Sequence, residues 1–305
     1  MKPSELPLAP DGSLYHIRLT SSTLADKVLL VGDPGRVNMF KEIFETIEFE
    51  SENREMHALT GTYHGTRMTA LSTGMGCDNI DIVMTELDAA LRVENGKWEV
   101  ESDRHLQIVR IGTSGSLQED IDCGSHVAST YAIGLDGLMN YYKEWRECGS
   151  TRECKEMEDA FINHLSPCAS HLSPFARPYC VEGSKLLLDK IAVDMHHGIT
   201  ATAPGFYGPQ GRTIRLHPAI ENLNEKLASF SWTTQSLSHS ATQSLKVTNL
   251  EMETSAIYGF SHLMGHEALT VCLIIANRPR GTFLNDYYKE MRELVGTVVE
   301  RMSKK

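Results

Sequence analysis

Two glutamates that flank a methionine are the first residues of this sequence whose types and spacing could do chemistry. Glu251, Met252 and Glu253 stand where an extended segment gives way to a helical pattern that ends at Gly265. The helix dipole alone usually explains acidic side chains in a first turn. A carboxylate held at a helix N-terminus beside a flat apolar side chain could also bind the vicinal hydroxyls of a sugar. The triplet is therefore a candidate ribose clamp that needs partners elsewhere in the chain.

Arginines beside glycine-rich turns are the second such feature. Arg110 lies near the end of the apolar run 106–111, just before a turn over 112–116 that offers hydroxyls and backbone N–H groups. A guanidinium inside an apolar strand is costly unless it meets an anion. A buried Glu or Asp is one candidate for that anion. We favour phosphate, because Arg36 and Arg54 stand near comparable turns and arginine forks match phosphate oxygens bidentately.

The loop 204–212 combines an aromatic ring, an amide and a guanidinium. These groups suit a flat heterocycle that carries carbonyls: Phe206 would stack on it, Gln210 would pair with an amide edge, and Arg212 would donate to a carbonyl oxygen. An ordinary surface loop anchored by Phe206 explains the same residues about equally well. The loop is thus a candidate base site only in company with the other features.

The elements that must position these residues alternate along the chain. Apolar runs bounded by Gly and Pro indicate strands, and three-four spacing of apolar residues indicates helices. Strands are expected over 27–31, 68–72, 106–111, 126–133, 198–203 and 269–276, and helices over 37–44, 79–93, 183–192, around 257–264 and near the C-terminus. The region 136–179 is interpreted as irregular and polar. This alternation predicts the α/β class, and we favour one large domain over two smaller ones.

Composition limits the partners. The 305 residues are 41% hydrophobic and 23% charged, which is enough to bury a large core. A formal net charge of −11 argues against binding nucleic acid or an anionic membrane surface. No run approaches the ~20 apolar residues needed to span a bilayer, and no leader segment is evident. We expect a soluble, cytoplasmic protein.

Neither a metal nor a nucleotide cofactor is indicated with any specificity. The 7 cysteines are scattered without a C-x-x-C pair, so reduced thiols are expected. Four of them lie with His164 and His171 between Cys148 and Cys180, but their spacings match no zinc finger or ribbon, and an inserted surface segment explains them better. The Gly74-x-Gly76 turn lacks the third glycine and the acidic residue of a dinucleotide fingerprint.

Five short motifs together resemble the nucleoside phosphorylase family, and within it the uridine phosphorylases. They occur in the family's order and at roughly its spacing, and the resemblance runs from about Tyr15 to the C-terminus. The motifs are Gly32-Asp33-Pro34-Gly35-Arg36, Arg110-Ile111-Gly112-Thr113-Ser114-Gly115, Phe206-Tyr207-Gly208-Pro209-Gln210-Gly211-Arg212, Glu251-Met252-Glu253 and Asn277-Arg278. The resemblance implies one three-layer α/β/α domain over residues 1–305 with a mixed central sheet.

The resemblance also implies roles for individual residues. Phosphate would be bound by Gly32, Arg36, Arg110 and Thr113, with Arg54 reaching the neighbouring subunit's site. The ribose would be bound by Thr113, Met252 and Glu253, with His16 holding the 5′-hydroxyl across the dimer. The base would be bound by Phe206, Gln210 and Arg212, with Arg278 nearby.

The implied activity is reversible phosphorolysis of uridine to uracil and ribose 1-phosphate. Phosphate is a substrate there, and the reaction requires no cofactor. Arg110 would orient phosphate, Glu253 would fix the ribose hydroxyls, and Gln210 with Arg212 would stabilise the departing uracil. A purine phosphorylase, a hydrolytic nucleosidase and a nucleoside-binding or storage protein without catalysis are the alternatives on the same fold.

Departures from the family pattern concern assembly. Asn79 stands where a relative has a serine near an interfacial cation, so a cation at Glu55 is only a candidate. The segment 142–179 has no counterpart and is interpreted as an insertion. Because an insertion of that size obstructs a second interface, we expect a homodimer with shared active sites in preference to a hexamer.

Overall fold

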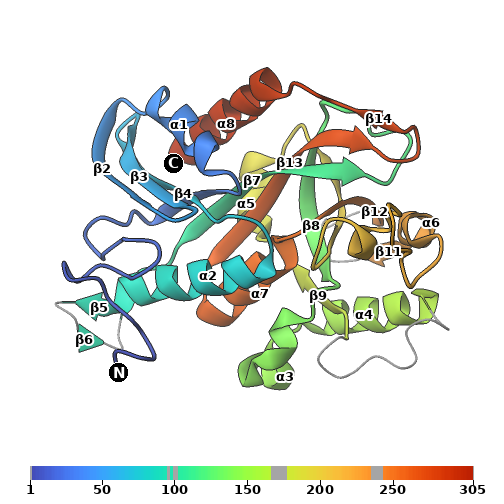
Figure 1. The fold of residues 1–305 in the computed structure, drawn as a ribbon, viewed down its shortest axis with the longest axis horizontal. Helices are drawn as coiled ribbons and strands as arrows, with labels where there is room; N and C mark the ends of the chain where they lie inside the picture. The colour runs from blue at the N-terminus through green and yellow to red at the C-terminus, as the bar shows by residue number, and fades with distance from the viewer. Residues whose placement is uncertain (1, 95–96, 99–101, 166–176, 235–242, 305) are drawn as a thin grey trace.

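A mixed β-sheet of 12 strands forms the centre of the molecule (Figure 1). The computed structural model describes residues 2–94, 97–98, 102–165, 177–234 and 243–304. The strands are β1 (Lys27–Val31), β2 (Thr46–Asn53), β3 (Met56–Tyr63), β4 (Thr66–Ser72), β7 (Gln107–Ser116), β8 (His126–Gly134), β9 (Tyr179–Glu182), β10 (His196–Thr202), β11 (Ser231–Thr234), β12 (Gln243–Glu251), β13 (Glu267–Asn277) and β14 (Thr282–Phe283), with β5 (Val93–Glu94) and β6 (Lys97–Trp98) paired separately. The helices are α1 (Pro34–Lys41), α2 (Cys77–Arg92), α3 (Lys143–Cys148), α4 (Arg152–Leu165), α5 (Lys185–Ile191), α6 (Leu223–Ser229), α7 (Thr254–Met264) and α8 (Tyr288–Ser303), with short 3₁₀ turns η1 (Leu138–Tyr141) and η2 (Gly208–Gln210).

The order of strands places four parallel strands side by side. The sheet runs β11-β12-β10-β8-β13-β7-β1-β4-β3-β2, with β9 on β8 and β14 on β13. Strand β1 pairs in parallel with both β4 and β7, and β7 pairs in parallel with β13. The carboxyl ends of β1, β4, β7 and β13 therefore meet at one edge, which is where open α/β sheets bind ligands.

Helices cover both faces of the sheet. In β1, Val28 and Leu30 pack into the core cluster that contains the buried face of α2 and α7. Leu29 and Val31 point the other way, into the cluster built with α1, α5 and α8. A strand that is apolar on both faces is typical of a sheet buried between two helix layers. The predicted α/β class and three-layer architecture are confirmed, and one sheet with its helices makes one domain.

Local signals account for the helices that border the site. Asp33 caps α1, its Oδ1 accepting a hydrogen bond from the Gly35 N–H at 2.8 Å, and Pro34 starts the helix. Helix α7 ends at Gly265, whose φ of 74° is left-handed, as the sequence predicted. These caps fix where the loops after β1 and β12 turn into helices.

The prediction of an irregular region over 136–179 is wrong for its described residues, 136–165 and 177–179. Helices α3 and α4 lie within it, and α4 buries Cys154, Met157, Phe161 and Leu165 at steps of three and four. The charged residues between them form the solvent face, which made the segment read as merely polar. Figure 1 shows α4 beside β9, at the same end of the molecule as α6 and β11. Residues 166–176 lie outside the described part, and the insertion over 142–179 stays a prediction.

The described residues contain one possible metal-binding cluster and no membrane-spanning helix. Cys168 and His171, which belonged to the zinc alternative, lie outside the described residues, and Cys154 and Cys180 are buried free thiols. Within the described ranges, only Glu50, Glu52 and His57 bring three metal-ligating side chains together. None of the described helices is long and apolar enough to cross a lipid bilayer.

Candidate active site

A pocket of about 640 Å³ opens at the edge where the parallel strands end. It is bounded by the turns after β1 and β4, the second half of β7, the end of β12 and the loop after β10. Most of the residues predicted from the sequence meet there: Gly32, Arg36, Arg110, Thr113, Phe206, Gln210, Arg212, Met252 and Glu253. Segments far apart in the chain thus form one cavity, with arginines at one end and the base loop at the other.

The residues expected to bind phosphate border the start of α1. Gly32 follows β1 directly, and Arg36 lies in the first turn of the helix with its side chain half-buried. Thr113 reaches the same cavity from β7. The Gly35 N–H already donates to Asp33 Oδ1 and the Arg36 N–H to the Asp33 carbonyl at 3.0 Å, so the guanidinium of Arg36 is the group of this turn that an anion can meet. The phosphate role of these residues stays a prediction.

Arg110 is paired internally, which corrects our preference for phosphate as its sole anion. Its guanidinium forms ion pairs with Glu253 and, at 3.2 Å, with Glu251. Burial lowers the pKa of Arg110, but the two negative charges outweigh it and hold that pKa above its usual value. A Cβ at Gly112 would lie 2.1 Å from Arg110 Nη1, so glycine makes room for the guanidinium. Arg110 still lines the cavity, where an anion can reach it.

The residues expected to bind ribose lie at the helix mouth that the sequence indicated. Glu253 is the N-cap residue of α7, and it accepts a hydrogen bond from the Gly76 N–H at 2.7 Å as well as pairing with Arg110. Burial and the neighbouring Glu251 raise the pKa of Glu253, against the opposing charge of Arg110. Met252 lies beside it at the wall of the cavity. Each oxygen of this buried carboxylate has one partner, Gly76 or Arg110, and retains a lone pair that can accept a hydroxyl hydrogen bond.

In the loop expected to bind the base, two guanidiniums orient one amide. Gln210 is 2% exposed, and its Oε1 accepts from Arg212 Nη1 at 2.7 Å and from Arg278 Nη2 at 2.5 Å. This leaves Nε2 as the end of the amide that a ligand can use. Arg278 lies behind the pocket lining, and burial with the nearby Arg212 lowers its pKa to about 10. The Arg212 guanidinium also lies 3.8 Å from the ring centroid of Phe206, which remains half-exposed.

Besides Arg278, two predicted residues, His16 and Arg54, do not reach this pocket within one chain. His16 is held away from it by Glu86, whose Oε1 lies 2.5 Å from His16 Nδ1 and whose Oε2 accepts from the N–H groups of His16 and Ile17 at 3.0 Å. Arg54 is exposed at the turn between β2 and β3, with a left-handed φ of 55°. Their assignment to a neighbour's site is a statement about assembly, which one chain does not test.

The cation predicted at Glu55 gains no support from ligand geometry. Glu55 lines the pocket, and a Cβ at Gly74 would lie 2.9 Å from its Cγ. The described three-ligand group is elsewhere, at Glu50, whose carboxylate already pairs with Lys41 and His57. A cation at Glu55 therefore stays a prediction.

Sequence reasoning missed Glu86 and the contacts of Glu251. Glu251 was part of the candidate ribose clamp but was given no separate role beside Arg110, and Glu86 gave no signal beyond a charge inside the apolar pattern of α2. Each is 4% exposed and accepts several hydrogen bonds. A buried carboxylate needs such donors, so burial would have been the informative observation.

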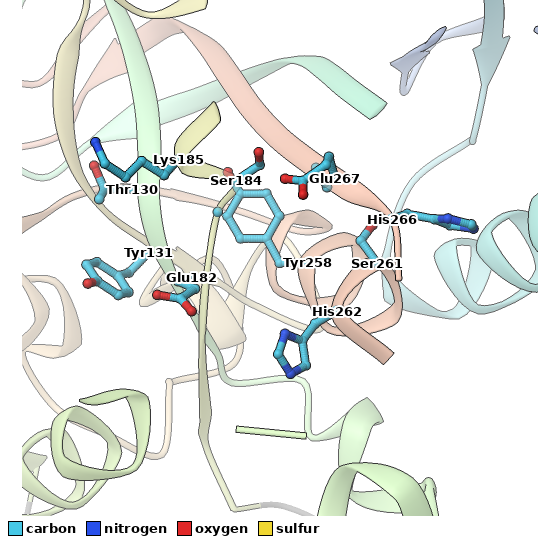
Figure 2. A pocket seen from close by; sticks show the side chains of 12 residues that line it. Thr130, Tyr131, Glu182, Ser184, Lys185, Tyr258, Ser261, His262, His266 and Glu267 are labelled. Carbon is cyan, nitrogen blue, oxygen red and sulfur yellow. The ribbon is translucent and has the colours of Figure 1, made fainter. Parts of the chain in front are cut away.

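A second, more polar cavity of about 290 Å³ lies apart from these residues. It is lined from β8, the end of β9, α7 and the start of β13, and Figure 2 shows Glu182, Lys185 and His262 spread around it. Its lining contains none of the residues predicted from the sequence.

Known proteins resemble this chain over nearly its whole length. A model of the phosphorylase superfamily matches residues 26–304. The uridine phosphorylase of Thermococcus kodakarensis is 27% identical over 280 residues, which cover 92% of this chain and 83% of that protein. A DeoD-type purine nucleoside phosphorylase of Exiguobacterium is 36% identical, but over 35% of this chain and 40% of its own length.

Solved structures agree. A Trypanosoma brucei nucleoside phosphorylase, described as showing uridine phosphorylase activity, superposes with a TM-score of 0.85 at 28% identity and covers 98% of this chain and 100% of its own. A uridine phosphorylase of the oomycete Phytophthora capsici, with a TM-score of 0.66 at 20% identity over 100% of this chain and 99% of its own, shares the fold. With the family model matching from the start of β1 to the end of α8, the chain belongs to the phosphorylase superfamily.

Proposed function

We propose that this protein catalyses the reversible phosphorolysis of uridine to uracil and ribose 1-phosphate. The observation that carries the proposal is the pocket itself, which joins Arg110, Glu253 and the Gln210 loop around one cavity. The full-length similarity to a protein named uridine phosphorylase supports the pyrimidine substrate. We expect the reaction to run in the cytoplasm without a cofactor, phosphate being a substrate.

The geometry suggests how each end contributes. Cleavage of the N-glycosidic bond makes the ribose cation-like and the base anionic. Arg36 and Arg110 would hold phosphate below the sugar, which supplies orientation. Glu253 would accept from the ribose hydroxyls. The Gln210 amide, whose Oε1 is held by two guanidiniums, would turn its N–H donors to the departing uracil, whose charge they stabilise.

A purine nucleoside is the alternative substrate, and the position of Asn277 bears on it. A purine phosphorylase would protonate the base through an Asp on the loop after the last core strand, where this chain has Asn277. The Asn277 amide is 1% exposed and donates to the carbonyls of Gln118 at 3.0 Å and Ile121 at 2.9 Å. It is outside the lining of the described pocket, and an amide has no acidic proton to give. Pyrimidine is therefore favoured.

The deciding experiment measures uracil release from uridine. Purified protein is assayed with and without phosphate, with inosine as the alternative substrate and Arg110→Met as the matched inactive variant. We expect phosphate-dependent uracil release, a poor rate with inosine and loss of activity in the variant. Release without phosphate would identify a hydrolase, a faster rate with inosine a purine phosphorylase, and uridine binding without turnover a binding protein.

We also propose that the active unit is a homodimer with shared sites. The support is the position of His16 and Arg54, which one chain holds outside its own pocket although the family resemblance gives both a substrate contact. Arg54→Ala subunits mixed with Arg110→Ala subunits would form dimers in which one pocket carries both lesions and the other neither. Random pairing makes about half of the dimers mixed, so activity should recover to about a quarter of wild type. No recovery despite demonstrated subunit exchange would refute sharing.

A further inference from the structure

One carboxylate of the pocket lining contacts both Arg110 and Glu253, the residues expected to bind phosphate and ribose. Glu251 Oε2 lies 3.2 Å from Arg110 Nη1 and accepts the Glu253 N–H at 2.9 Å. The same side chain accepts the Thr254 N–H at 3.0 Å and the Thr202 hydroxyl at 2.7 Å. We propose that Glu251 is a positioning residue that keeps Arg110 and Glu253 in place while they exchange their mutual ion pair for substrate. The inference rests on the proposed phosphorolysis at this site.

The three charges are buried together but are anchored differently. Arg110, Glu251 and Glu253 are 4%, 4% and 5% exposed. Glu251 has two backbone donors and the Thr202 hydroxyl besides Arg110. Glu253 has one backbone donor in the described chain, the N–H of Gly76, besides Arg110. Glu251 is therefore the fixed carboxylate, and Glu253 is the one that can turn to other donors.

This difference matters when substrates arrive. If Arg110 binds phosphate and Glu253 accepts ribose hydroxyls, the ion pair between them must loosen. Breaking a buried ion pair leaves an uncompensated charge, which costs several kcal/mol. Because Glu251 stays bonded to Arg110, the guanidinium keeps one counter-charge throughout the exchange. This lowers the free-energy cost of separating Arg110 from Glu253.

The anchoring of Glu251 comes from two elements. Thr202 ends β10 and donates to Glu251 Oε1, while its own oxygen accepts the Ser255 N–H at 3.0 Å. The N–H of Thr254, the first residue of α7, completes the contact. The Thr202 hydroxyl at the end of the strand thus holds Oε1, and the N–H groups of Glu253 and Thr254 at the helix mouth hold Oε2, so the carboxylate stays in place as a fixed counter-charge beside Arg110 Nη1.

The test replaces Glu251 by glutamine in the whole protein. Glu251→Gln keeps the shape and removes the charge, so Glu253 becomes the sole counter-charge of Arg110 and both substrates must break a tighter pair. We expect kcat/KM for uridine and for phosphate to fall about 10- to 100-fold, the range found when a residue that orients a ligand group is lost. Glu251→Asp retains the charge and should recover part of the activity.

A pH profile separates this role from a structural one. The charged groups acting on Glu253 are Arg110 and Glu251, while the nearby thiol of Cys77 has a pKa raised well above its usual value and stays neutral. Since the Glu251 charge raises the pKa of Glu253, removing it should move the acid limb of kcat/KM to lower pH. As a matched control, Asp136→Asn removes a carboxylate that accepts from Ser255 Oγ at 2.8 Å and has no described bond to Arg110 or Glu253. Asp136→Asn should lower Tm without shifting the acid limb of the kcat/KM profile.

Phosphate binding by calorimetry makes the outcome independent of turnover. Phosphate alone should bind Glu251→Gln about tenfold more weakly than wild type, the free-energy equivalent being about 1.4 kcal/mol. If the glutamine variant does not fold, Thr202→Val removes one anchor of Glu251 and should shift the same readouts in the same direction by a few fold. If the wild-type protein shows no phosphorolysis, the proposed function is refuted, but the phosphate affinities of wild type and Glu251→Gln can still be compared by calorimetry. Equal phosphate affinity and an unmoved acid limb in Glu251→Gln would refute the positioning role.

Discussion

Substituting Gln210→Glu separates the folding role of this side chain from its chemical role. The new carboxylate has the shape of the amide and would keep both acceptor contacts, to Arg212 at 2.7 Å and to Arg278 at 2.5 Å. Those contacts already have charged donors, and the new carboxylate would turn them into ion pairs, whose Coulomb attraction is stronger in a buried site than in water. We therefore expect Tm to stay unchanged or to rise.

The rate of uridine phosphorolysis should fall in Gln210→Glu. The substitution removes the Nε2 donor and places a negative charge beside a base that becomes anionic. Loss of one donor to a developing anion costs about 2.7–4 kcal/mol, and each 1.36 kcal/mol is tenfold in rate, so kcat should fall about 10²- to 10³-fold. Repulsion by the new charge adds to this, although the two guanidiniums offset part of it.

The assay is the initial rate of uracil release from uridine at saturating phosphate, together with a thermal melt. Gln210→Ala is the companion variant, because it removes the donor without adding charge and leaves Arg212 and Arg278 without their common acceptor. We expect the alanine variant to lose stability and the glutamate variant to lose more activity. A glutamate variant with wild-type Tm and activity within tenfold of wild type would refute the leaving-group role of Gln210.

Three further predictions concern other parts of the molecule. Glu86→Gln weakens the support of His16, so the KM for uridine should rise several fold while that for 5′-deoxyuridine stays unchanged; an equal rise for both would contradict the 5′-hydroxyl contact. Because burial and Glu251 raise the pKa of Glu253, protonation should reduce kcat/KM as the pH falls while still above ~4.3, the ordinary value for Glu, and an acid limb at or below that value would contradict it. Phe161→Ala should lower the free energy of unfolding by about 3–5 kcal/mol, because this fully buried ring packs against Phe230 at 5.1 Å between centroids. Denaturant titration checks it, and a loss below about 1 kcal/mol would mean that α4 is not part of the core.

The sequence by itself determined most of the regular elements and most of the residues that meet in the pocket. Apolar runs bounded by Gly and Pro predicted β1, β7, β8 and β13, and the cap residues Asp33 and Gly265 marked one helix start and one helix end. These signals are local, because the period of the apolar residues and the backbone preferences of Gly and Pro act within a few residues. Helix α4 was not predicted, because charged residues separate its few apolar positions and obscure their helical spacing.

The tertiary structure decided which of these residues act on one another. Arg110 meets Glu253 across 143 positions of the chain, and Gln210 meets Arg278 across 68. The sequence offered an acid or a phosphate as the partner of Arg110 and favoured phosphate, whereas the fold supplies two acids. Such pairings depend on the strand order, which brings β7, β12 and β13 to one edge. Strand order is set by the packing of the whole chain. The residues next to an arginine or a glutamate in the sequence therefore do not reveal which distant residue will be its partner.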